Sequence, residues 1–370
     1  MPRQTLARIH LDNLRHNFRL AGERAGAGRA MAVVKADGYG HGIERVARAL
    51  SEDTGYYAVA CLEEAMVLRQ VGLTQPVLLM QGVHQAPDLA MCEAEGFTVV
   101  VHHEHQLGWL TSGSARPRVW LKVNSGMNRL GFAPGEVRGV CQRLLNAGIP
   151  VTGAMTHFAC ADDEASERTV EQTAVFDGAT ASLAPIERSV ANSAAHFRPG
   201  QRMFDWSRPG IMLYGSSPML GHQGPDLGLK AVMTLESRLI AIRQLVAGEA
   251  VGYGEAWRCN RPTLMGMVSI GYGDGYPRHA VNGTPVGIRG ARAPLIGRVS
   301  MDMLAVDLTG VEGAAVGDPV ELWGRTIPVD EVAACAGTIS YELLTGVTGR
   351  VPRVESNGEH TDGQTTGTVS

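Results

Sequence analysis

The sequence predicts an α/β protein in which an N-terminal (β/α)₈ TIM barrel, residues 10–229, is followed by a mostly β C-terminal domain, residues 230–355. Short strand-like runs and longer amphipathic stretches alternate about eight times over roughly 220 residues, which is the number of units and the size of such a barrel. Beyond residue 230 the chain changes to strand-like alternation punctuated by glycine. A doubly wound open sheet is the alternative, but no GxGxxG motif follows the first strand, which disfavours its dinucleotide-binding form.

Hydrophobic periodicity predicts the individual elements. Residues 6–10 alternate as a strand, and Asp12 is placed to cap a helix whose Leu14, Phe18 and Ala21 share one face. The eight barrel strands are predicted at 32–34, 56–60, 76–80, 97–101, 118–123, 151–156, 188–191 and 203–206. Helical patterns separate most of them, for example at 62–71, 136–146 and 167–183.

The sequence also predicts the structure of the two ends of the chain. Residues 1–9 are able to add a strand to the C-terminal domain. Residues 356–370 lack apolar anchors, so we predict a disordered tail there.

Composition argues against several classes of function. A formal net charge of −4 at pH 7, with no cluster of basic residues, disfavours a nucleic-acid partner. No apolar run approaches the roughly 20 residues of a membrane span. The charged start, MPRQTLARIHLDNLRHN, lacks the apolar core of a secretory signal. The 6 cysteines form no CxxC pair, so we expect no metal site, and we predict a cytoplasmic protein.

The stretch AVVKADGYGHG places Lys35 directly after a buried apolar strand, at the start of a glycine-rich bend. A desolvated lysine loses its charge easily, and the neutral amine is a nucleophile. The alternative is a lysine that extends its ammonium group to solvent from a strand end.

Other candidate residues follow the remaining strands, at the rim where parallel barrels bind their ligands. Arg129 follows the fifth strand, His157 ends the sixth, Ser193 follows the seventh and Arg208 ends the eighth. Each has an ordinary explanation as well: a surface ion pair, a hydrogen-bonded core residue or a helix cap. Their shared position at one rim favours a functional site.

The segment after Arg208 predicts an anion site. Gly210 allows close approach of the backbone, and the amides of Gly210 and Ile211 are placed to donate to an anion near Ser193. Barrels often bind phosphate between their last two strands in this way. A phosphate site and a strand-end lysine in one barrel mouth suggest pyridoxal phosphate, although spacing alone leaves other phosphorylated ligands open.

The chain resembles the alanine racemase family, whose members use pyridoxal phosphate and consist of a (β/α)₈ barrel followed by a β domain. The resemblance covers almost everything from residue 6 to about residue 353. It is carried, in family order, by AVVKADGYGHG, GMNRLG, RPGIMLYG, VGYGEAW, GYGDGYPR, GRVSMDM and ISYELL.

The resemblance implies roles for the barrel residues and for Tyr341 of the C-terminal domain. Lys35 would carry pyridoxal 5′-phosphate, and Arg208 would meet its pyridine nitrogen. Arg129 would meet the phenolic oxygen of the cofactor and the carboxylate of the substrate. The phosphate would be held by five residues, namely Tyr39, Ser193, Gly210, Ile211 and Tyr341.

The resemblance also implies roles for the C-terminal domain. Tyr253 would be the second catalytic base, oriented by His157. The backbone around Met301, with Asp302 nearby, would help to hold the substrate, and Tyr272 would narrow the entrance. Because these residues and Lys35 fall in different domains, the resemblance implies a head-to-tail homodimer with shared sites; a closed monomer is the alternative.

Four positions differ within the family or from its usual pattern. Lys122 matches a position that in some members carries a carbamate bracing the arginine; the alternative is an ordinary strand lysine. Asn124 and Ser125 stand where the family more often has Asp-Thr, just before the Arg129 loop. Gly346 stands where relatives can carry a larger residue near Tyr341.

The implied reaction is the interconversion of L-alanine and D-alanine, either supplying D-alanine for peptidoglycan or serving alanine catabolism. Removing a proton from one face and returning it to the other calls for two bases, Lys35 for the D-isomer and Tyr253 for the L-isomer. Both must titrate about 3 units below their reference pKa values of about 10.4 and 10. The alternatives are a barrel-type amino-acid decarboxylase, a racemase of broader specificity and a non-catalytic cofactor-binding protein.

Overall fold

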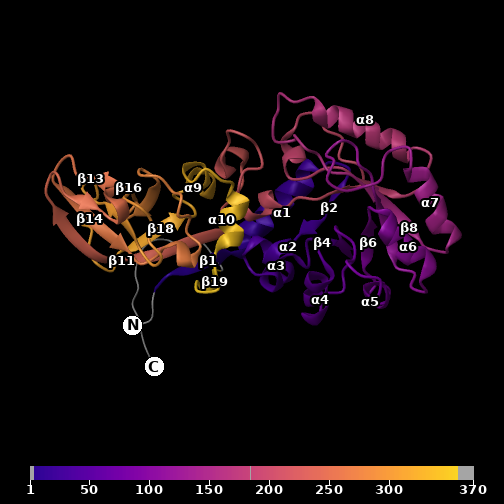
Figure 1. The fold of residues 1–370 in the computed structure, drawn as a ribbon, viewed down its shortest axis with the longest axis horizontal. Helices are drawn as coiled ribbons and strands as arrows, with labels where there is room; N and C mark the ends of the chain where they lie inside the picture. Colours follow the sequence, from indigo (N-terminus) through magenta and orange to yellow (C-terminus); the bar gives the residue numbers. More distant parts are fainter. Residues whose placement is uncertain (1–3, 184, 357–370) are drawn as a thin grey trace.

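The computed structural model describes residues 4–183 and 185–356. The molecule is elongated, with the barrel at one end and the β domain at the other (Figure 1). Helix α10 (Ser340–Gly346) lies between them, beside α2 (Lys35–Tyr39), with which it is in contact. Among the described residues, no helix is both long and apolar enough to cross a bilayer.

The barrel is a circle of parallel strands. In spatial order they are β2 (Arg29–Ala30), β10 (Trp206–Ser207), β9 (Glu187–Ser189), β8 (Val151–Met155), β7 (Arg118–Lys122), β6 (Thr98–Val101), β5 (Val77–Leu79), β4 (Tyr57–Val59) and β3 (Ala32–Val33). Strands β2 and β3 are two halves of one segment, interrupted at Met31. The first pairs with β10 and the second with β4, which brings the sheet almost to closure. The predicted barrel is therefore confirmed.

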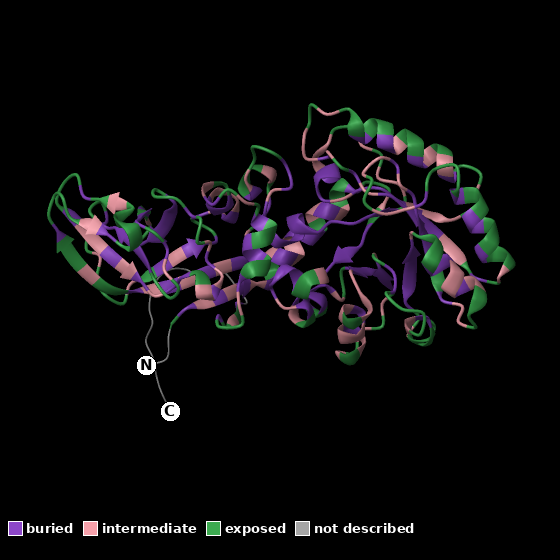
Figure 2. Ribbon diagram, in the orientation of Figure 1, coloured by how far each residue is buried: buried purple, intermediate pink, exposed green. Residues whose placement is uncertain are grey.

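Amphipathic helices cover the outside of this sheet. They are α1 (Leu11–Arg24), α3 (Ile43–Leu50), α4 (Leu62–Gln70), α5 (Asp88–Ala94), α6 (Glu104–Ser112), α7 (Val137–Asn146) and α8 (Arg168–Thr180). Their inward faces are buried against strands that are themselves almost wholly buried (Figure 2). Burial of both faces of the sheet explains why the strands read as continuous apolar runs instead of alternating ones.

The cap predicted for α1 is wrong. His10 occupies the N-cap position, and Asp12 lies inside the first turn, where its carboxylate pairs with Arg15 at 2.9 Å. A carboxylate there still interacts favourably with the helix dipole. The predicted apolar face, with Leu14, Phe18 and Ala21, is buried.

The β domain contains a second closed sheet, this time antiparallel. Its strands follow the order β14 (Thr263–Val268), β17 (Leu304–Asp307), β16 (Ala291–Ile296), β15 (Pro285–Ile288), β18 (Pro319–Trp323) and β11 (Met233–Leu245), and β11 also pairs with β14. Strand β1 (Leu6–His10) joins β11 antiparallel and β19 (Arg353–Ser356) parallel. The N-terminal strand thus lies in the C-terminal sheet.

Several predicted limits differ from the structure; the seventh barrel strand, for example, is Glu187–Ser189 instead of 188–191. The last barrel strand is at Trp206–Ser207 instead of 203–206, and the two-residue strand β2 was not predicted. Both are too short for periodicity to locate. Of the predicted disordered tail, Ser356 is the last residue of β19, and residues 357–370 lie outside the described part of the chain.

Candidate functional site

Lys35 begins a left-handed turn at the carboxyl end of β3. The four residues that follow it have positive φ angles: Ala36 52°, Asp37 53°, Gly38 59° and Tyr39 51°. Only one of them is glycine. Left-handed helical backbone costs roughly 1–2 kcal/mol for each residue with a side chain, so the three others store on the order of 3–6 kcal/mol. Strain of this size persists only where the surroundings impose it, as they commonly do at functional sites.

The surroundings of Lys35 favour its neutral form. Burial lowers the pKa of Lys35, and the nearby cation of Arg129 lowers it further, whereas the Glu64 carboxylate raises it. A lysine with a lowered pKa at a barrel mouth is the arrangement expected of a nucleophilic amine.

A group of residues that we call the cup lies beside the turn; its members are Tyr39, Ser193, Gly210, Ile211 and Tyr341. The Ser193 hydroxyl accepts hydrogen bonds from the backbone amides of Gly210 at 2.8 Å and Met212 at 3.4 Å. The ring of Tyr39 stacks on Tyr214 with centroids 4.6 Å apart, and Tyr341 lies 6.1 Å from Tyr39. A Cβ atom at Gly210 would come within 2.3 Å of the Tyr39 Oη atom, so any larger residue would have to displace the Tyr39 ring from its stack.

The structure therefore brings together all five predicted phosphate residues. Ile211 belongs to this cup as the first residue of the short helix η2 (Ile211–Tyr214), for which Gly210 is the N-cap residue. Hydroxyl groups and backbone amides around a residue without a side chain form a suitable cradle for a phosphate group.

Arg208 is buried directly after β10, two residues before Gly210 of the cup. Its Nη1 donates to the Ser189 hydroxyl, and its Nη2 donates to the Thr156 and Val190 carbonyls and lies 3.5 Å from His157 Nδ1. Burial lowers the pKa of Arg208 to about 9, so it is still charged at neutral pH. Its Nε atom is buried and finds no hydrogen-bond partner among the described residues. This donor is suited to an acceptor such as a pyridine nitrogen.

A cluster of basic side chains lies next to Arg208. Lys122, Arg129 and His157 line one small cavity. Burial lowers the pKa of Lys122 to about 7, and the charges of Arg208, Arg129 and Lys35 act in the same direction. Burial and these same cations hold the pKa of His157 well below its usual value. A site with this charge would bind an anionic ligand favourably.

The unusual Asn124 supports the Arg129 loop. Its Oδ1 atom accepts from the backbone amides of Gly126 at 3.2 Å and Asn128 at 3.0 Å, and its Nδ2 atom donates to the Asn128 side chain at 3.0 Å. Ser125 is hydrogen bonded to Thr156 at 2.7 Å. Asparagine therefore provides the turn with the same kind of acceptor that aspartate would.

Apart from Tyr341, the predicted residues of the C-terminal domain, namely Tyr253, Tyr272, Met301 and Asp302, are not part of this site. Tyr253 lies in η4 (Tyr253–Glu255), which leads into β13 (Trp257–Arg258) at the end of the molecule farthest from the barrel (Figure 1). Its side chain is 69% exposed, and Tyr272 and Met301 are also accessible. The backbone amides of Tyr272 and Gly273 donate to Ser300 and Met301, and Asp302 pairs with Arg350. Within one chain, therefore, His157 does not orient Tyr253.

Comparison with known proteins agrees with these features. The sequence profile of the alanine racemase N-terminal domain matches residues 9–218, and that of the alanine racemase C-terminal domain matches residues 232–355. The chain belongs to the alanine racemase family. The predicted isomerase class is thereby confirmed.

Individual relatives match along nearly the whole chain. The alanine racemase of Marinobacter nauticus is 60% identical over 96% of this chain and 99% of its own length. The biosynthetic alanine racemase of Pseudomonas aeruginosa superposes with a TM-score of 0.92 at 45% identity, covering 96% of this chain and 100% of that one. The enzyme of Bartonella henselae, with covalently bound pyridoxal phosphate, has a TM-score of 0.86 at 30% identity, with coverage of 96% and 100%.

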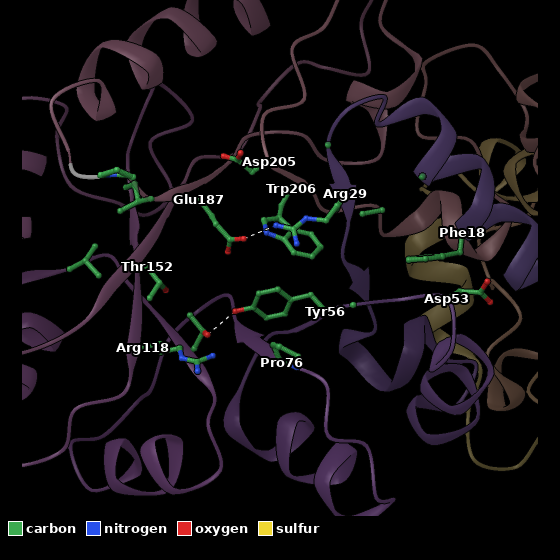
Figure 3. A pocket seen from close by; sticks show the side chains of 18 residues that line it. Phe18, Arg29, Asp53, Tyr56, Pro76, Arg118, Thr152, Glu187, Asp205 and Trp206 are labelled. Atoms are coloured by element: carbon green, nitrogen blue, oxygen red, sulfur yellow. Dashed lines mark hydrogen bonds and ion pairs between the residues drawn. The ribbon is translucent and has the colours of Figure 1, made fainter.

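A larger cavity, of about 1050 Å³, opens at the other end of the barrel. Residues at the amino ends of the strands line it, among them Arg29, Tyr56, Arg118 and Trp206 (Figure 3). Arg29 lies over the Trp206 ring at 3.9 Å and pairs with Glu187 at 2.7 Å. None of the predicted site residues lines this cavity. Since barrel enzymes of this family type react at the carboxyl ends of the strands, size alone does not identify the site here.

Two residues of the site went unpredicted. Glu64 and His41 contact the backbone of the left-handed turn. Nothing in the spacing of AVVKADGYGHG shows that the turn is left-handed, so the sequence offers no reason to single out its supports.

Proposed function

We propose that this chain interconverts L-alanine and D-alanine with pyridoxal 5′-phosphate, using Lys35 and Tyr253 on opposite faces of the substrate. One observation carries the proposal: the barrel mouth brings together Lys35, which has a lowered pKa, a cup suited to phosphate, and a buried arginine whose Nε atom has no partner among the described residues. The covalently bound cofactor of the Bartonella henselae relative supports the same assignment.

The residues of the site fit this cofactor at each end. Lys35 would hold it covalently, the cup around Ser193 and Gly210 would hold its phosphate, and Arg208 Nε would donate to its ring nitrogen. When bound, pyridoxal phosphate withdraws electrons from the substrate and so acidifies the α-hydrogen. Arg208 can only donate, because guanidinium remains protonated at neutral pH. The ring nitrogen would thus stay unprotonated, which favours racemisation over transamination.

The chain's own residues would then move the proton. Lys35, whose pKa is lowered by burial, would serve the α-proton of the D-isomer, and Tyr253 that of the L-isomer. Arg129 would hold the substrate carboxylate, assisted by the backbone at Met301 and by Asp302. Tyr272 would narrow the entrance.

The position of Tyr253 supports a head-to-tail homodimer. An exposed tyrosine at the far end of the β domain cannot reach the Lys35 of its own chain, but it can face the barrel of a second copy. Tyr272 and Met301 of the same domain are accessible as well, so all three side chains are available to a second copy. Each site would then use a barrel from one chain and a β domain from the other.

Proton exchange in heavy water tests this function. The purified protein with pyridoxal phosphate is incubated in D₂O with L- or D-alanine, and the α-proton is followed by NMR together with optical inversion. We expect both isomers to exchange and invert, and serine, lysine and arginine to react more slowly. Loss of CO₂ without inversion, or absence of exchange from either isomer, would contradict the proposal.

The Gly210 position gives a prediction about cofactor binding. In Gly210→Ala the new methyl group would collide with Tyr39, which is held by its stack on Tyr214. Overpacking of this kind costs about 1–3 kcal/mol, so pyridoxal phosphate should bind roughly tenfold to a hundredfold more weakly. The affinity is measured by titrating the cofactor-free protein with pyridoxal phosphate. Gly346→Ala is the matched control, because nothing lies within 4 Å of its Cβ position. Equal affinities for the two variants would count against the cup.

We further propose that Lys122 is carbamylated. The neutral amine attacks CO₂ and loses one proton, leaving a carbamate of negative charge among Arg129, Arg208 and Lys35. With a pKa of about 7, Lys122 is increasingly neutral as the pH rises through 7, so carbamylation should increase over that range.

Labelled bicarbonate tests this proposal. We expect a carbon-13 carbamate signal that vanishes in Lys122→Arg and weakens below pH 7. Removing CO₂ should lower activity roughly tenfold, equivalent to about 1.4 kcal/mol of lost support for Arg129. If the wild-type protein gives no such signal and its activity does not change when CO₂ is removed, Lys122 is an ordinary strand lysine.

A further inference from the structure

The left-handed turn after Lys35 is held from one side by a carboxylate. Glu64, in the first turn of α4, accepts a hydrogen bond from the Ala36 amide at its Oε1 atom, 2.7 Å away. Its Oε2 atom accepts from the Ala60 amide at 2.8 Å. One carboxylate therefore joins the residue directly after Lys35 to the residue directly after β4, and each of its two oxygens is engaged.

The other side of the turn is held by a buried imidazole. His41 is 0% exposed, and its Nδ1 atom lies 3.0 Å from the Gly38 carbonyl oxygen and 2.9 Å from that of Tyr39. Since both partners are acceptors, Nδ1 must carry the proton. Burial lowers the pKa of His41 to about 4, which keeps the ring neutral with this tautomer.

The ring of His41 also belongs to the aromatic stack beside the phosphate cup. It packs against Tyr214 with centroids 4.7 Å apart, and Tyr214 stacks on Tyr39. The other ring nitrogen of His41, Nε2, has no hydrogen-bond partner among the described residues. The polar contacts of this side chain are therefore directed at the turn.

We propose that Glu64 and His41 are positioning residues, which together hold the strained turn Ala36–Tyr39 and thereby fix Lys35 at one end and Tyr39 at the other. Three residues with side chains adopt left-handed backbone here, and such backbone relaxes unless outside contacts impose it. Glu64 fixes the start of the turn and His41 its end. This inference rests on the proposed function, to which it adds the supports of the cofactor lysine and of one phosphate contact.

The Glu64→Gln variant tests the first support against Glu63→Gln, its neighbour in the same helical turn. An amide has one acceptor oxygen in place of two, so one of the two backbone amides loses its partner. We expect pyridoxal phosphate affinity to fall about tenfold and kcat about a hundredfold, since a misplacement of about 1 Å costs that much. KM for alanine should change little, because Arg129 is untouched. Equal behaviour of the two variants would overturn the role of Glu64.

The His41 support is tested with a pair of amides. His41→Asn keeps an N–H donor at the place of Nδ1, whereas His41→Gln moves its amide away, and both remove the ring. We expect Asn to retain roughly tenfold more cofactor affinity and kcat than Gln, a difference that loss of packing alone would not produce. If Asn and Gln are equally impaired, His41 acts only by filling space.

Hydrogen exchange separates this inference from the proposed function. In the cofactor-free full-length chain, the amides of Gly38, Gly40 and Gly42 are hydrogen bonded within the turn. Their exchange should accelerate in Glu64→Gln and His41→Gln but not in Glu63→Gln. Unchanged exchange would overturn the holding role even if the wild type racemises alanine. A wild type that fails to racemise would refute the proposed function while leaving this measurement valid.

Discussion

Replacing Lys35 by alanine is expected to lower the rate of alanine racemisation by at least about 10⁴-fold, the upper range for loss of one acid–base group. The loss should be this large because the same amine would hold the cofactor and exchange the proton of the D-isomer. Racemisation is measured by optical inversion and by α-proton exchange with pyridoxal phosphate present in excess.

Reduction with borohydride provides the companion measurement. In the wild type it should fix pyridoxal phosphate to the peptide that contains Lys35, and in Lys35→Ala the label should disappear. Lys230→Ala is the control, since Lys230 is exposed and lies outside the site. Label on another lysine, or substantial activity in Lys35→Ala, would refute the assignment of Lys35.

The barrel half of this site could be predicted from sequence for a geometric reason. Parallel strands all present their carboxyl ends at one rim, so Lys35, His157 and Arg208 converge although they are far apart along the chain. The resemblance to alanine racemases added Tyr341, whose position in α10 follows from no barrel rule. The structure then placed it beside Tyr39.

The left-handed turn, its supporting residues and the exposure of Tyr253 depend on backbone geometry that composition does not encode. Ala36, Asp37 and Tyr39 are not residues from which a left-handed turn would be predicted, so the roles of Glu64 and His41 became visible only from their contacts. The exposure of Tyr253 agrees with the shared sites that the resemblance implies, but neither composition nor periodicity predicts it. Asp12 shows how imprecisely a sequence pattern locates the end of a helix. It is a residue type that often caps helices, but it lies two positions after the actual N-cap residue, His10.

Mixing two inactive variants is expected to restore activity. A Lys35→Ala chain retains Tyr253, and a Tyr253→Ala chain retains Lys35. If each site combines the barrel of one chain with the β domain of the other, a heterodimer has one doubly altered site and one intact site. Random exchange gives about half heterodimers, each with half its sites intact, so activity should reach about a quarter of the wild-type value.

This experiment separates shared sites from self-contained ones. A monomeric site would contain one altered base in every chain, so no mixture could exceed the parents. Differently tagged chains establish that exchange has occurred, and the Tyr253→Ala homodimer should still bind pyridoxal phosphate, since every cofactor contact proposed above lies in the barrel or on α10. Recovery would show that the exposed Tyr253 works in the partner's barrel. Proven exchange without recovery would mean that the second base must be sought among the side chains already at the barrel mouth, where His157 lies beside Arg208.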